Sequence, residues 1–125
     1  MRDRISDEKA NQIAIAGVSL GALTSLLAGF HSRLLDERID AVVSIAGPGS
    51  LFAGGFFARS DLPLLLVYAG ADAIVPYEEN AIHLQTLYPA ATLVTLRGAS
   101  HAGFAQPSAT IMRFIDNPDR VGCRA

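Results

Sequence analysis

Four short apolar runs divide the chain, and polar or glycine-rich segments connect them. The runs are residues 13–16, 41–46, 62–68 and 92–96. They are rich in leucine and β-branched residues and show little alternation with polar residues, which is typical of strands buried on both faces of a parallel sheet. We therefore expect four buried strands.

Helical spacing of apolar residues follows two of these runs. After the first run, leucines recur at intervals of one to three residues, at Leu20, Leu23, Leu26 and Leu27. After the third run, Pro76 suits the first turn of a helix that extends to about residue 88. A last helix is expected from residue 107 to residue 114 or 116. Because strands joined through helices pair in parallel, the pattern predicts an α/β fold: a mostly parallel, four-stranded sheet flanked by helices.

The junction between the first strand and its helix, residues 17–21, reads Gly-Val-Ser-Leu-Gly. In such a turn the two glycines lack Cβ atoms where the strand and helix backbones approach each other. Ser19 would present its hydroxyl at the helix N-terminus. There the backbone N–H of Leu20 and the helix dipole would stabilise an oxyanion.

Two other interpretations of this stretch remain open at this point. It could be an ordinary buried strand and helix without catalytic function. Alternatively, the eighteen residues 13–30 contain no charge, and Gly17 and Gly21 form a Gly-x-x-x-Gly pattern, which is found in dimerising membrane helices. Evidence from the rest of the sequence is needed to choose among these interpretations.

Composition limits the classes of function that the chain can have. A length of 125 residues fits one domain, and a net charge of -2 without a basic run argues against a nucleic-acid partner. Cys123 is the only cysteine, and the N-terminus lacks the order of a secretory signal, so we expect a cytoplasmic protein. We find no metal-ligand cluster and no phosphate-binding glycine loop, so no metal and no cofactor are implied.

A loop rich in phenylalanine, residues 47–59, begins where the second strand ends. It contains Phe52, Phe56 and Phe57. Ligands of α/β sheets bind outside the carboxyl ends of the strands, so these rings could line a pocket for the apolar part of a substrate. Equally, they could seal the edge of the sheet.

Ser19, Asp72 and His101 each follow one of the expected strands. A serine hydroxyl is a weak nucleophile, so an imidazole has to take its proton and a carboxylate has to orient that imidazole. Parallel strands end at the same edge of a sheet, which would bring the three side chains together. Their order along the chain, Ser, Asp, His, is the one expected of α/β-hydrolases.

The chain resembles the C-terminal part of an α/β-hydrolase of the dienelactone hydrolase and small carboxylesterase type, from about residue 13 to 114. The resemblance rests on three motifs: residues 17–21, Asp-Ala-Ile-Val-Pro at 72–76, and Gly-Ala-Ser-His-Ala-Gly-Phe at 98–104. It implies that Ser19 is the nucleophile, His101 the base and Asp72 the group that orients the base. The implied substrates are small-molecule esters or related acyl compounds, with no nucleic-acid or membrane partner.

The family's full sheet has further strands before the nucleophile strand, whereas about a dozen residues precede residue 13 here. We therefore expect residues 1–125 to be a single, N-terminally truncated domain with the Ser19 strand at the sheet edge, and a homodimer could form through that edge. Two hypotheses follow. The chain is a serine hydrolase with a Ser-His-Asp triad, or it is a catalytically silent fragment that acts only as a structural or interaction domain.

Overall fold

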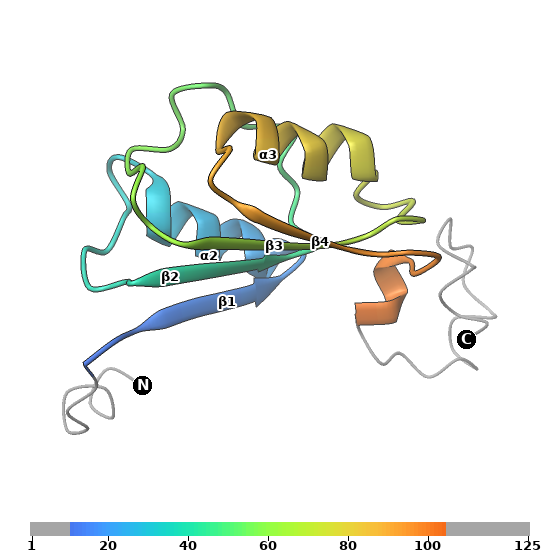
Figure 1. The fold of residues 1–125 in the computed structure, drawn as a ribbon, viewed down its shortest axis with the longest axis horizontal. Coiled ribbons are helices and arrows are strands. Elements are labelled where there is room, and N and C mark those ends of the chain that lie inside the picture. Colours follow the sequence, from blue (N-terminus) through green and yellow to red (C-terminus); the bar gives the residue numbers. More distant parts are fainter. Residues whose placement is uncertain (1–10, 105–125) are drawn as a thin grey trace.

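The computed structural model describes residues 11–104 of the chain, and Figure 1 shows their arrangement. The helix expected from residue 107 onward lies outside the described residues. In chain order the elements are β1 (Ala14–Val18), α2 (Leu20–Phe30), β2 (Ala41–Ile45), β3 (Leu64–Ala69), a π-helical segment (Glu78–Ile82), α3 (His83–Leu87), β4 (Thr92–Leu96) and a 3₁₀ turn (His101–Phe104).

The four strands form one sheet in the order β1-β2-β3-β4, and every neighbouring pair is parallel. The expected fold class is therefore confirmed. The boundaries of β1, β2 and β3 differ from the expected runs by one or two residues. β1 continues to Val18, directly before Ser19. β3 begins only at Leu64, because Pro63 has no N–H to donate, although its carbonyl accepts a hydrogen bond from the Val42 N–H.

The hydrophobic core lies between one face of the sheet and the helices α2 and α3. The side chains of β2 and β3 that point to this face are fully or almost fully buried, and so are the helix side chains that pack against them. Together they form a single cluster whose members include Leu26, Phe30, Val42, Leu64, Leu66, Tyr68, Leu84 and Tyr88. This packing holds α2 against β1 and β2 and joins α3 to the same core.

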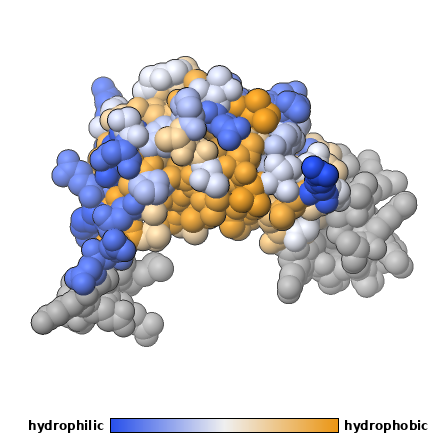
Figure 2. Space-filling model, in the orientation of Figure 1, coloured by the Kyte–Doolittle hydropathy of each residue, from blue (hydrophilic) through white to orange (hydrophobic). Residues whose placement is uncertain are grey.

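The other face of the sheet is apolar as well, but the described residues leave much of it accessible. The side chains of Val18, Val94 and Leu96 are 44%, 40% and 42% exposed. Half-buried apolar residues, Val43 and Leu65 among them, lie between these on β2 and β3. Figure 2 shows hydrophobic residues gathered over β1 and β2.

The uncharged stretch 13–30 is divided between β1, the turn at Ser19 and α2, so reading it as one membrane helix is wrong. α2 has only 11 residues. Within residues 11–104, no helix combines the length and the hydrophobicity needed to cross a membrane.

The two glycines of the turn are not equivalent. A Cβ atom at Gly17 would overlap the carbonyl group of Gly21, whereas a Cβ atom at Gly21 would meet nothing within 4 Å. The expectation that both glycines allow the close approach therefore holds for Gly17 alone. Its hydrogen side chain lets the start of α2 lie directly against β1.

Replacing each glycine by alanine tests this asymmetry. Gly17→Ala forces backbone atoms apart, so we expect it to lower the free energy of unfolding by about 3 kcal/mol or more. Gly21→Ala should be neutral, or should stabilise the protein by up to about 1 kcal/mol, because alanine favours a helix. Urea unfolding of both variants measures the difference. Equal stabilities would contradict the asymmetry.

Candidate active site

Ser19 occupies a tight turn between β1 and α2. Its backbone has φ 56° and ψ -114°, a conformation that costs a residue other than glycine about 1 to 3 kcal/mol. Two sets of hydrogen bonds hold it there. The Ser19 N–H donates to the Ile45 carbonyl at 2.8 Å, and the Ser19 carbonyl accepts from the N–H groups of Ala22 and Leu23. The turn is therefore tied to both β2 and α2.

Asp72 lies in the loop after β3, and its side chain has no solvent-accessible area. One carboxylate oxygen, Oδ1, accepts hydrogen bonds from the backbone N–H groups of Ile74 at 2.9 Å and Val75 at 2.7 Å. These bonds fix the orientation of the carboxylate. They leave the other oxygen, Oδ2, to face the loop that follows β4.

His101 joins the carboxylate to the serine. Its Nδ1 lies 2.7 Å from Asp72 Oδ2, and its Nε2 lies 2.9 Å from Ser19 Oγ. An ionised carboxylate can only accept hydrogen bonds, so Nδ1 carries a proton and Nε2 is free to accept the proton of the serine hydroxyl. An arrangement of this kind can convert a serine hydroxyl into a nucleophile.

The structure thus brings together the three residues that the sequence singled out, although Ser19 and His101 are 82 residues apart. The fourth group, the Leu20 N–H, lies beside Ser19 in the first turn of α2. The intrahelical hydrogen bonds to the Ser19 carbonyl start only at Ala22 and Leu23. Backbone N–H groups at such a position favour a negatively charged ligand atom.

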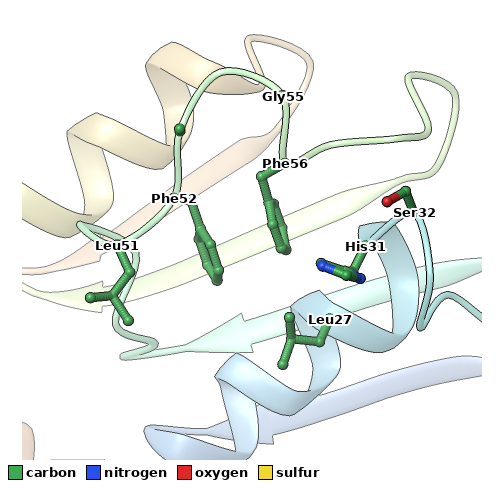
Figure 3. Close-up of a pocket in the computed structure, with 8 residues that line it drawn as sticks. Leu27, His31, Ser32, Leu51, Phe52, Gly55 and Phe56 are labelled. Carbon is green, nitrogen blue, oxygen red and sulfur yellow. The ribbon is translucent and has the colours of Figure 1, made fainter.

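The three phenylalanines of the loop separate into two groups. All three rings are partly buried and pack against the core, and Phe57 lies edge-to-face on Phe30 with ring centroids 4.9 Å apart. Phe52 and Phe56 stack on each other at 3.8 Å and line a cavity of about 400 Å³ beside Leu27 (Figure 3). Ser19, Asp72 and His101 do not line this cavity. The sealing interpretation therefore fits all three rings, and a substrate pocket remains a prediction for Phe52 and Phe56.

Tyr68, a buried residue of β3, anchors the start of the loop. Its hydroxyl donates to the Gly47 carbonyl at 2.6 Å. Burial raises the pKa of the Tyr68 phenol well above its ordinary value, so the hydroxyl keeps its proton and remains a donor. The loop therefore begins at a fixed point directly after β2.

Asn80 and His83 anchor the next residues of the loop, and neither role was predicted. Asn80 Oδ1 accepts from the N–H groups of Gly49 at 2.8 Å and Ser50 at 3.0 Å. His83 is half-buried, and its Nε2 donates to the Phe52 carbonyl at 2.7 Å. A polar residue within a helical pattern was the available signal, but it did not reveal a partner about thirty residues away.

Solved structures share this fold, whereas no protein-family model matches the sequence and no curated protein matches it at a significant level. An α/β serine hydrolase homologue from Coxiella burnetii is 26% identical, with a TM-score of 0.61 over 80% of this chain and 46% of that one. An α/β serine hydrolase without a lid from Xanthomonas campestris is 27% identical, with a TM-score of 0.60 over 77% of this chain and 41% of that one.

A third structure, Est1E from Butyrivibrio proteoclasticus, is 17% identical, with a TM-score of 0.60 over 80% of this chain and 58% of that one. At this identity the likeness concerns the fold alone. The chain spans about half the length of these three structures. Its parallel sheet, its order of elements and these likenesses support a hydrolase fold, and the chain belongs to the α/β-hydrolase superfamily.

Proposed function

We propose that the chain is a serine hydrolase that cleaves ester or related acyl bonds through an acyl-enzyme. The observation that carries this proposal is the unbroken series of hydrogen bonds from Asp72 through His101 to Ser19. In this proposal Ser19 is the nucleophile, His101 the general base and then the general acid, and Asp72 the group that orients the imidazole.

The geometry supports a two-step reaction. Ser19 Oγ attacks the acyl carbon while its proton passes to His101 Nε2, and the charge that develops on the carbonyl oxygen is stabilised by the Leu20 N–H. The alcohol then leaves with the proton from His101, and the acyl group stays on Ser19. A water molecule, deprotonated by His101, releases the acid and restores the serine.

Two further features support the proposal. Backbone strain such as that of Ser19 persists only where the surrounding structure holds it, and it is concentrated at functional sites. The carboxylate of Asp72 is fully buried yet uses both of its oxygens as acceptors. A buried charge with this arrangement of partners can stabilise the imidazolium that forms when Ser19 loses its proton.

A second candidate function is a catalytically silent interaction domain, possessing the fold without the activity. The observation that favours it is β1, which has one neighbouring strand among the described elements and whose alternate residues Ala14, Ala16 and Val18 are exposed. An unpaired strand edge can pair with another chain, and a homodimer through β1 would cover it. Such pairing is compatible with the hydrolase as well.

Covalent labelling with a fluorophosphonate probe tests the nucleophile. We expect the folded protein to be labelled and Ser19→Ala to lose the label completely, because the probe reacts with an activated serine. Ser60→Ala, which removes an exposed serine hydroxyl in the loop before β3, should be labelled like the unmodified protein. A folded protein without any label would favour the interaction domain.

Asp72→Asn tests the orientation of the imidazole. The side-chain carbonyl of asparagine can still accept from Ile74 and Val75, but its NH₂ group cannot accept the Nδ1 proton of His101. We expect kcat to fall by about 10³- to 10⁴-fold with little change in KM or thermal midpoint. Asp36→Asn, which removes an exposed charge next to Arg38, should change kcat less than about twofold. A small effect of Asp72→Asn on kcat would contradict the proposed role.

Self-association through β1 can be measured by sedimentation at increasing protein concentration. If the free edge pairs with a second copy, the average mass should rise toward that of a dimer. Ala16→Lys places a charge on this strand and should lower the dimer fraction. Thr86→Lys, at an exposed position on α3, is the matched control and should leave it unchanged. A monomer at all concentrations would exclude the homodimer.

A further inference from the structure

An apolar stripe runs along α2, away from Ser19. It consists of Leu20, Leu23 and Leu27, whose spacing places them on one side of the helix. Their neighbours Ala22 and Leu26 face the sheet and are fully buried. Leu20 is 73% exposed and the other two are half-buried. These three leucines therefore lie outside the buried core cluster.

The phenylalanine loop runs beside α2 over its whole length. Near Ser19, a Cβ atom on Gly47 would lie 2.8 Å from the Cβ atom of Ala22. At the far end, the Ala58 N–H donates to the Phe30 carbonyl at 2.9 Å. Between these points the loop and the helix flank the open, groove-like cavity that Phe52 lines (Figure 3). The stripe thus leads from the site around Ser19 to that cavity.

The cavity is built before any ligand arrives. Two buried side chains, Tyr68 from β3 and Asn80 from the π-helical segment, and the half-buried His83 of α3 hold the loop backbone at Gly47, at Gly49 and at Phe52. The stacked rings of Phe52 and Phe56 form one wall, and Leu27 forms the opposite one. Apolar walls held in this way lose little conformational entropy when an apolar group binds.

We propose that the acyl chain of the substrate lies along the leucine stripe and ends in the cavity between Leu27 and Phe52, so that the preferred esters carry medium-length to long unbranched acyl chains. This inference rests on the proposed function, because the ester carbonyl is placed at Ser19. The carbonyl group then lies among the polar groups of the site, and the hydrocarbon lies along leucine and phenylalanine side chains until it reaches His31 and Ser32 at the end of the cavity.

The geometry of α2 sets the length of that chain. Leu27 follows Ser19 by eight residues, which at 1.5 Å per residue is a distance of about 12 Å along the helix axis. An extended chain advances roughly 1.2 Å per bond, so roughly ten carbons reach the cavity. His31 and Ser32 line the cavity as well, at the end of the helix. Contact with these polar groups does not favour hydrocarbon, so much longer acyl chains should not raise kcat/KM further.

Hydrolysis of a series of p-nitrophenyl esters tests this inference. We expect kcat/KM to rise from butyrate through octanoate to laurate, by up to about three- to fourfold per buried methylene, and to rise no further with palmitate. Leu27→Asn should lower the laurate-to-butyrate ratio of kcat/KM about tenfold or more. Leu34→Asn replaces an exposed leucine beyond α2, outside the stripe and the cavity, and should leave the ratio unchanged.

Ala53→Trp provides a second variant in case Leu27→Asn does not fold. Ala53 is exposed and lines the cavity, so a tryptophan there would fill it without disturbing the core. The favoured chain should then shorten from laurate toward octanoate. Equal kcat/KM values for all four esters, or a ratio that neither cavity variant changes, would overturn the inference while leaving the hydrolase proposal intact.

Calorimetry of laurate binding to Ser19→Ala protein tests the acyl-chain inference separately from the hydrolase proposal, because binding requires no reaction. Binding that Leu27→Asn weakens about tenfold and Leu34→Asn leaves unchanged would support the cavity even if no ester is hydrolysed, in which case the proposed function alone fails. Absence of laurate binding, together with a flat chain-length profile, would overturn the inference.

Discussion

The parallel pairing of four strands is the constraint on which the candidate site depends. Because all the strands run in the same direction, β1, β3 and β4 end at one edge of the sheet, and each is followed by one of the three polar residues, Ser19, Asp72 and His101 (Figure 1). Sliding one strand by two residues would displace its side chain by about 6.6 Å, far more than a hydrogen bond tolerates. Strand register therefore sets the geometry of the catalytic chemistry that we propose.

The turn at Ser19 shows how an edge strand can still hold a strained residue. β1 pairs only with β2 among the described strands, yet the Ser19 N–H donates to the carbonyl of Ile45, the last residue of β2. Gly17 adds a second restraint, because its missing side chain lets α2 lie directly on the strand. A backbone conformation that costs energy is thus maintained by contacts on two sides.

Polar and apolar parts of the chain are segregated along α2. The hydrogen-bonded polar groups gather at the first residue of the helix, and the cavity lined by Phe52 lies beside its last turns (Figure 3). Three hydrogen-bonding side chains, those of Tyr68, Asn80 and His83, hold the loop that forms the cavity wall. An ester has the same division, with one polar reacting group and one hydrocarbon chain, and this match connects the two proposals.

The sequence alone determined the four strands, the parallel α/β architecture and the choice of Ser19, Asp72 and His101, because apolar periodicity and turn motifs are local signals. Only the tertiary structure determines that His101 Nδ1 lies 2.7 Å from Asp72 Oδ2 and that His101 Nε2 lies 2.9 Å from Ser19 Oγ. It also decided that Gly17, and not Gly21, is required for close packing. These features depend on side chains and backbones that meet in space across several elements, and no local pattern encodes such distances.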